Sequence, residues 1–296
     1  MKKTMRITML GTGHATVTRC FNTCFVVEQT IDGTTYRLLV DGGGGNGILA
    51  QLEKAGIALS SIHDLFITHA HTDHLLGCVW VVRMVMQLML DGRYDGTLNV
   101  YSHAKCLRLL RQICQETLHS DYVHFLDDRV ILHQLRDGDH FCVGDMYLQC
   151  FDICSRKEKQ YGFIVFDSDY MNGNFAPAPG DYSGDTPIKI RLACLGDEPF
   201  KNQCWRYVTG VEWLMCEAFC LYRDRDVFDP YGKYHSTARD AGKLADELGV
   251  KNLILYHTED RHLDTRRRDY AQEAAEFFKG RICVPDDLET IELTSL

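Results

Sequence analysis

The stretch His69-Ala70-His71-Thr72-Asp73-His74 contains four potential metal ligands within six residues. It follows a β-branched, apolar run at residues 65–68 that predicts a strand, and it precedes a longer apolar run at residues 75–90 that predicts a buried helix. His69 and His71 lie two residues apart, so both imidazoles project to the same side of an extended chain. Imidazole and carboxylate groups are donors that zinc prefers in hydrolytic sites. The stretch therefore predicts a metal centre at the end of this strand.

Strand and helix patterns alternate along the chain, as in proteins built from α/β layers. Apolar runs predict further strands at residues 7–10, 24–27, 37–40, 146–153, 162–166, 190–194, 213–216 and 253–256. Helices are predicted at residues 48–55, from a Ser102 cap through His119, and from Thr237, with Asp240 as its capping-box partner, to the residue before Gly249. With 45% hydrophobic residues and no dividing linker, residues 1–296 are expected to form a single domain.

Composition and charge narrow the class of protein. The formal net charge of −9 weakly disfavours a basic nucleic-acid surface, and the run Arg266-Arg267-Arg268 is interpreted as a solvated face. We expect no secretory signal at the N-terminus and no disulfide framework among the thirteen cysteines, and therefore a cytoplasmic protein with reduced thiols. The apolar run at residues 75–90 is shorter than the roughly 20 residues of a membrane span, so no membrane association is expected.

Further short motifs surround the histidine stretch in a fixed order. They are Met9-Leu10-Gly11-Thr12-Gly13, Cys20-Phe21-Asn22-Thr23, Leu39-Val40-Asp41-Gly42-Gly43-Gly44, Cys194-Leu195-Gly196-Asp197, Cys216-Glu217-Ala218-Phe219, His235-Ser236-Thr237 and Leu255-Tyr256-His257. With these motifs the chain resembles the metallo-β-lactamase superfamily, and specifically its ribonuclease Z-like phosphodiesterase branch. The resemblance covers nearly the whole chain and implies an α/β fold, the αββα four-layer sandwich, in which two similar halves bring their loops to one edge.

The resemblance also carries over a set of ligands for two divalent metal ions. It assigns His69 and His71 to the first ion, Asp73, His74 and His257 to the second, and Asp197 as a bridge between them. Zinc is the metal we expect, with manganese and iron as alternatives. Such a pair of ions would share a hydroxide that attacks a phosphodiester.

The third protein ligand of the first ion departs from the family pattern. Relatives place a histidine on the strand before a glycine-aromatic segment, but residues 151–163 contain none. The best match is Cys154, because a thiolate is a good zinc ligand. Asp152, which points to the same face two residues earlier, is one alternative. The other is that Cys154 is a buried thiol and that the first ion is weakly held.

Three more positions are candidates for roles in catalysis. The resemblance makes Glu217 and His235 a proton-handling pair near the leaving oxygen, where a general acid assists departure of an alkoxide, and it counts Asp73 with them. Asp41 ends a predicted strand and is expected to orient a metal-bound histidine. The four glycines after Asp41 are interpreted as room for the backbone beside the metals, since no Walker-type lysine follows them.

The expected reaction is hydrolysis of a phosphodiester by a metal-bound hydroxide. Enzymes of this branch that mature transfer RNA usually carry a long arm, and here only residues 167–189 are available for it, including a Gly- and Pro-rich loop predicted at residues 171–185. A small or cyclic phosphodiester therefore stands beside RNA as the expected substrate, and a homodimer is left open. Hydrolysis of an ester or lactone, or a binding module that has lost metal, are the alternative functions.

Overall fold

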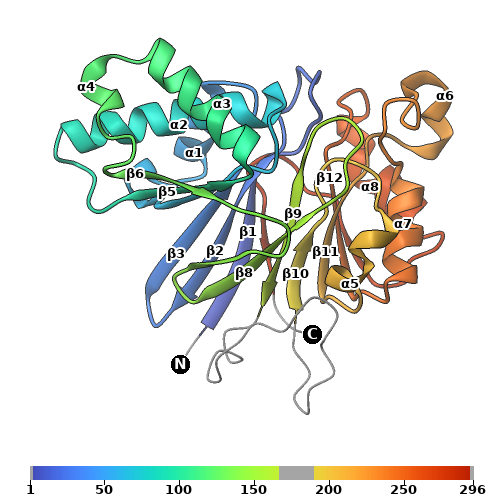
Figure 1. Ribbon diagram of the computed structural model, residues 1–296. Coiled ribbons are helices and arrows are strands. Elements are labelled where there is room, and N and C mark those ends of the chain that lie inside the picture. Colours follow the sequence, from blue (N-terminus) through green and yellow to red (C-terminus); the bar gives the residue numbers. More distant parts are fainter. Residues whose placement is uncertain (1–2, 167–189, 294–296) are drawn as a thin grey trace. The chain divides into compact units, whose positions relative to one another are not determined.

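The structure, a computed structural model, describes residues 3–166 and 190–293 (Figure 1). The loop predicted at residues 171–185 lies outside this range. The described residues form two compact units, the first from residues 3–135 and 286–293 and the second from residues 136–166 and 190–285. Within these ranges each unit contains one seven-stranded sheet. The expectation of a single domain stays a prediction.

The sheet of the first unit mixes antiparallel and parallel strands. Its order is β14 (Thr290–Glu292), β1 (Lys3–Gly11), β2 (Cys24–Ile31), β3 (Thr34–Val40), β4 (Asp64–Phe66), β5 (Leu98–Ser102) and β6 (Val130–Gln134). Pairing is antiparallel from β14 to β3 and parallel from β3 to β6. Its helices are α1 (Gly47–Lys54), α2 (Thr72–Leu90), α3 (Ala104–Thr117) and α4 (Ser120–Val123), with a 3₁₀ turn at Leu59–Ser61.

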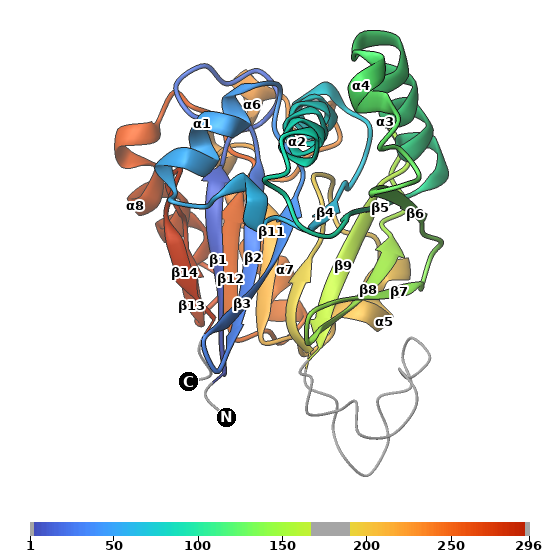
Figure 2. The same cartoon turned by 90° about the vertical axis from the view of Figure 1, so that its left-hand side faces the viewer.

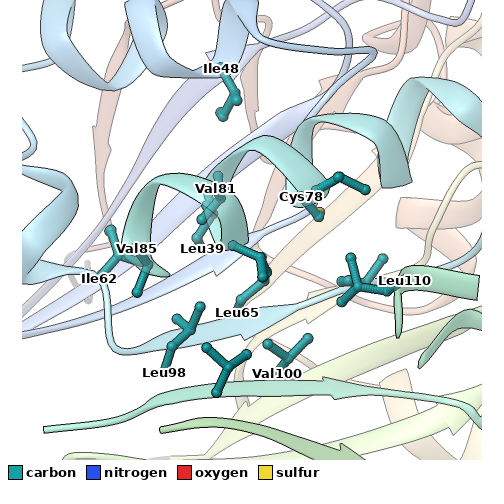
Figure 3. Packing of buried hydrophobic residues seen from close by; sticks show 14 of the residues in the cluster. Leu39, Ile48, Ile62, Leu65, Cys78, Val81, Val85, Leu98, Val100 and Leu110 are labelled. Atoms are coloured by element: carbon teal, nitrogen blue, oxygen red, sulfur yellow. The ribbon is translucent and has the colours of Figure 1, made fainter. Parts of the chain in front are cut away.

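Helix α2 forms the centre of the core of this unit. Val81 and Val85 on α2 face Leu65 on β4 and Leu98 on β5, and all four are fully buried (Figure 3). Among the described residues α2 is long and apolar enough to cross a membrane by length and composition alone, but 56% of its most apolar window is buried within the structure. The prediction of a buried helix after the histidine stretch is therefore confirmed.

Glycines bring the loop after β3 against the first turns of α2. A Cβ on Gly77 would lie 1.7 Å from the carbonyl oxygen of Gly42, which no side chain can tolerate. The backbones are joined there by hydrogen bonds from Gly42 N–H to the His74 carbonyl (3.0 Å) and from Gly77 N–H to the Gly43 carbonyl (2.8 Å). This close approach supports the interpretation of the glycines as room for the backbone.

The second unit repeats this order of strand directions. Its sheet runs β13 (Arg281–Cys283), β12 (Asn252–Tyr256), β11 (Trp213–Glu217), β10 (Ile190–Cys194), β9 (Tyr161–Phe166), β8 (Met146–Asp152) and β7 (His140–Val143), parallel from β13 to β10 and antiparallel from β10 to β7. Its helices are α5 (Trp205–Val208), α6 (Arg225–Phe228), α7 (Ala238–Glu247) and α8 (Leu263–Ala274), with 3₁₀ turns at Asn202–Cys204 and Tyr222–Asp224.

Helices of the second unit bury one face of its sheet. Ala241 and Ala245 on α7 and Tyr270 on α8 pack in one cluster with Leu214 and Leu253 of the parallel strands, and Figures 1 and 2 show α5 and α7 beside that sheet. The predicted cap of α7 is confirmed: Thr237 and Asp240 form a reciprocal capping box. The predicted Ser102 cap is wrong, because Ser102 is the last residue of β5 and the ring of His103 accepts the capping hydrogen bond of α3.

Candidate metal centre and active site

The loop between β4 and α2 gathers the histidines of the first unit. His69 is 1% exposed, and His71 is the N-cap residue of α2 with extended backbone. The Nε2 atom of His69 lies 2.9 Å from Nδ1 of His71, and the rings of His69 and His74 have centroids 4.1 Å apart. Asp73 Oδ2 lies 3.4 Å from Nε2 of His74. All four donors of the stretch are therefore neighbours.

These distances fit a metal centre. Two donors of one tetrahedral zinc ion, each at 2.0–2.1 Å from it, lie about 3.3 Å apart. The 2.9 Å and 3.4 Å separations between the donor atoms of the pairs His69–His71 and His74–Asp73 lie on either side of that value. Burial makes it costly to leave such polar groups together without compensation. Each pair is a suitable part of a divalent metal site.

Asp41 holds His74 in place. It follows β3 with φ of 57°, a left-handed conformation that turns its carboxylate toward the histidine loop. The Oδ2 atom lies 2.7 Å from Nδ1 of His74 and also accepts from the Thr68 hydroxyl, while Oδ1 accepts from the Thr68 N–H. Burial opposes protonation of His74, but the charges of Asp73 and Asp41 outweigh it and raise the pKa of His74. Asp41 is placed as expected for a residue that orients a metal-bound histidine.

Replacing Asp41 by Asn is expected to weaken metal binding by about 10–100-fold, the usual cost of losing such a partner. Asparagine tolerates a positive φ, so the backbone is preserved, but its amide cannot accept from His74 and from both Thr68 donors at once. Metal affinity would be measured by competition with a chromogenic chelator. Asp64→Asn is the control, because Asp64 is a partly buried carboxyl of the same unit that pairs with Asn99 and Tyr101. Equal affinities in both variants would contradict the role of Asp41.

The parallel strands of the second unit bring three further residues to one sheet edge. Asp197 follows β10, Glu217 ends β11 and His257 follows β12, and all three are buried. The His257 backbone has φ of 59°. Its Nε2 atom lies 3.6 Å from Asp197 Oδ2, and its Nδ1 atom lies 3.9 Å from Glu217 Oε2. Asp197 and His257 thus form a donor pair of the kind seen in the first unit.

Glu217 and His235 form the predicted pair. Glu217 Oε2 lies 2.7 Å from Nδ1 of His235, and Oε1 accepts from the N–H of Ser236 at 2.7 Å. The His235 ring stacks on Phe219 with centroids 4.4 Å apart. Ligand atoms of Glu217, His235 and His257 all lie within 4.8 Å of one another. The His235 ring is therefore fixed at its edge and on one face.

Burial dominates the electrostatics of this pair. It raises the pKa of Glu217 well above the usual range, with the Asp197 charge adding to the effect and the His257 charge opposing it. It also lowers the pKa of His235 to about 4; the Asp197 charge opposes this shift, and the Lys157 ammonium adds to it. Neutral His235 is therefore favoured in the protein as described.

Cys154 and Asp152, the two candidates for the third ligand of the first ion, lie outside the groups of close donors among the described residues. Cys154 is exposed, so the alternative that it is a buried thiol is wrong. Its sulfur lies 3.7 Å from the carbonyl oxygen of Asp152, and burial together with the Asp152 charge raises the pKa of the thiol. The Asp152 carboxylate pairs with Lys159 at 3.2 Å. Neither residue belongs to a group of three or more close donors in the described part of the chain, and the third ligand of the first ion stays a prediction.

Comparison with known proteins places the chain in a family. The family model described as Anti-Pycsar protein Apyc1 matches residues 5–192. The chain belongs to the Anti-Pycsar protein Apyc1 family. Curated relatives of this Apyc1-family chain include Ribonuclease Z of Brevibacillus brevis, 25% identical over 98% of this chain and 97% of the relative, and Ribonuclease Z of Methanothermobacter thermautotrophicus, also 25% identical with the same coverage.

Solved structures agree on the fold of this Apyc1-family chain. The metallo-β-lactamase fold protein YhfI from Bacillus subtilis has a TM-score of 0.71 at 15% identity, covering 98% of this chain and 99% of YhfI. The short form of human tRNase Z has a TM-score of 0.66 at 17% identity, covering 98% and 100%. The predicted αββα metallo-β-lactamase fold and the ribonuclease Z-like branch are confirmed. With curated relatives named Ribonuclease Z and buried histidine and carboxylate donors, the chain is a metal-dependent, ribonuclease Z-like hydrolase.

Proposed function

We propose that this protein hydrolyses a small or cyclic phosphodiester, with Glu217 and His235 handling the proton that the leaving oxygen needs. The observation that carries the proposal is the 2.7 Å contact between Glu217 Oε2 and His235 Nδ1 beside the donor pair Asp197–His257. Ester hydrolysis needs no such proton donor when the leaving group is activated. A buried carboxylate that fixes a histidine next to the donors therefore supports phosphodiester cleavage.

The donor pairs are proposed to hold two divalent ions, zinc in the first place, with manganese or iron as alternatives. In this proposal His69 and His71 would hold the first ion, Asp73, His74 and His257 would hold the second, Asp197 would serve both, and Cys154 or Asp152 would complete the first site. When bound, such ions supply Lewis acidity and a nucleophilic water. Five of these donors, His69, Asp73, His74, Asp197 and His257, are buried, and little bulk water around them strengthens the charge interactions among them.

The side chains of the protein itself do the positioning. Glu217 accepts from Nδ1–H of His235 and so directs Nε2, the only other ring nitrogen, away from the strand. Stacking on Phe219 prevents the ring from tilting. Nε2 carries no proton in the neutral ring, so it would first take up a proton from solvent to give the imidazolium, which Glu217 stabilises through Nδ1–H, and would then pass that proton to the leaving oxygen. Asp73, 6% exposed beside His74, is proposed to serve both as ligand and as a catalytic carboxylate.

The choice of substrate rests on two features of the sequence. Only residues 167–189 are available for an arm of the kind that transfer-RNA-processing enzymes carry, and the net charge of −9 disfavours a long RNA contact. Relatives named Ribonuclease Z and tRNase Z support RNA as the second candidate. A cytoplasmic location and a homodimer belong to the same proposal, the first because the cysteines are free thiols and the second because the resemblance to this branch implies it.

The test compares three substrates at a fixed metal load. The purified protein is assayed with a cyclic nucleotide, a precursor transfer RNA and an activated aryl ester, before and after chelation and metal re-addition. We expect metal-dependent turnover of the cyclic nucleotide that exceeds cleavage of the RNA. Activity on the precursor RNA alone would replace the small substrate by RNA. Activity confined to the ester would overturn the phosphodiesterase proposal, and a protein without bound metal or activity would support the binding-module alternative.

A further inference from the structure

A buried carboxylate organises the turn that follows β8. Glu198, 2% exposed and adjacent in sequence to Asp197, accepts from the Ser155 hydroxyl at 2.5 Å and from the N–H groups of Arg156 and Lys157 at 3.0 and 3.1 Å. Three donors from consecutive residues on one carboxylate fix the backbone of the turn. The turn is therefore tied to the strand end that carries a predicted metal ligand.

Two of the cationic side chains of this turn, those of Arg156 and Lys157, reach the segment that contains His235. The Lys157 ammonium lies 3.1 Å from Nε2 of His235, and the Arg156 guanidinium lies over the Tyr234 ring, 5.9 Å from its centre. Tyr234 has φ of 58°, and the N–H of His235 donates to the Pro230 carbonyl at 2.7 Å, so this segment is itself a tight, fixed turn. Lys157 thus meets a ring whose position is already determined.

The chemistry of the donors settles the hydrogen-bond directions. An ammonium only donates, so Nε2 of His235 accepts from Lys157 and the ring proton is on Nδ1. Nδ1–H then donates to Glu217 Oε2, while the other carboxylate oxygen of Glu217 accepts from the N–H of Ser236. Hydrogen bonds thus link Lys157, His235 and Glu217 in a row. The atom that the proposed reaction needs, Nε2 of His235, is occupied by the Lys157 ammonium.

We propose that Lys157 is a phosphate-binding residue of the active site. Without substrate its ammonium rests on Nε2 of His235; with substrate it moves to a non-bridging oxygen of the phosphodiester, and Nε2 is then free to take up from solvent the proton that it passes to the leaving oxygen. An anionic oxygen is a stronger partner for an ammonium than a neutral imidazole. The side chain is exposed beyond its anchored backbone, so its flexible stem permits the move. The proposal rests on the proposed function and names an anionic phosphodiester as the ligand.

The first experiment measures phosphate binding without catalysis. Inorganic phosphate is titrated into the metal-loaded protein, with calorimetry for affinity and side-chain ¹⁵N chemical shifts of His235 as the local signal. Lys157→Met is expected to weaken phosphate binding by about tenfold or more and to remove the phosphate-induced shift of Nε2, while Lys157→Arg retains most of both because the charge is kept. Lys159→Met is the matched control, since Lys159 lies in the same turn but pairs with Asp152.

The second experiment measures rates. Lys157→Met is expected to lower kcat/KM on a cyclic nucleotide by about 10²-fold, the usual loss for one stabilising donor, and to leave turnover of a neutral aryl ester unchanged. Lys159→Met should match the wild type on both. If Lys157→Met binds phosphate as tightly as the wild type and shows the same phosphate-induced shift of His235 Nε2, the inference is overturned, even if the wild type is an active phosphodiesterase. Absence of phosphodiesterase activity in the wild type overturns the proposed function, and the phosphate titration then still decides the role of Lys157.

Discussion

Changing His71 and His74 together to alanine is expected to empty the metal centre and to abolish hydrolysis. His71 is the neighbour of His69 at 2.9 Å, and His74 is the neighbour of Asp73 and the partner of Asp41. Each proposed ion thus loses one imidazole, and the water-activating chemistry depends on both ions. Metal content would be measured by elemental mass spectrometry on the purified chain, where we expect a fall from about two ions to near none.

A double variant elsewhere in the same unit provides the control. His119 and His124 are exposed; His119 caps the short helix α4 and His124 packs against Phe125. The variant with alanine at both positions should keep its metal and its activity. Circular dichroism shows whether both double variants fold. Full metal content in the folded His71/His74 variant would rule out the assignment of the centre.

The end of β4 shows how far local sequence predicts the site. The pattern predicts a strand to Thr68, but the structure ends β4 at Phe66. The reason is that the Thr68 N–H donates to the side chain of Asp41, 27 residues earlier, and is not part of the strand ladder. The apolar pattern predicts that this strand exists and that the histidines follow it. It carries no information about a distant side chain, such as that of Asp41, that accepts the hydrogen bond of a backbone N–H.

Contacts between residues far apart in the sequence explain two features that the sequence patterns do not predict, the strand β14 and the burial of Arg266. Strand β14 pairs with β1 from the opposite end of the chain, with Arg6 facing Glu292. The prediction that the arginine run is solvated is wrong for Arg266, which is 1% exposed and donates to the Thr258 hydroxyl and the Pro285 carbonyl. A buried guanidinium depends on such partners, and their proximity follows from the fold and not from neighbouring residues.

The turn around Lys157, which we propose to be part of the active site, also depends on contacts between residues far apart in the sequence. The run Ser155-Arg156-Lys157-Glu158-Lys159 has the composition of a solvated turn. What distinguishes Lys157 from Lys159 is the contact of its backbone with Glu198, 41 residues later, and that of its ammonium with His235. In the sequence, the feature that could have indicated these contacts is Glu198, directly after the predicted metal ligand Asp197. A carboxylate at that position is a potential acceptor for the N–H groups of a neighbouring loop.

Replacing His235 by alanine is expected to separate phosphodiester from ester chemistry. Metals alone provide a nucleophile for either substrate, so the metal donors do not distinguish the two reactions. A poor alkoxide leaving group needs a proton, and the ring fixed between Glu217 and Phe219 is the one placed to pass it. General acid catalysis contributes about 10²–10⁴-fold, so hydrolysis of a cyclic nucleotide should fall by that factor in His235→Ala. An activated aryl ester leaves unaided and should be affected little.

The measurement is a paired comparison of kcat/KM on the two substrates at equal metal occupancy. His262→Ala is the matched control, because His262 is also paired with a buried carboxylate, Glu259 at 2.8 Å, and so costs the fold a similar contact. A general loss of stability would lower both activities in both variants. A loss confined to the phosphodiester in His235→Ala is the outcome that proton delivery requires. Equal losses on phosphodiester and ester would remove His235 from the chemistry and favour an ester- or lactone-hydrolysing enzyme built on the same metal donors.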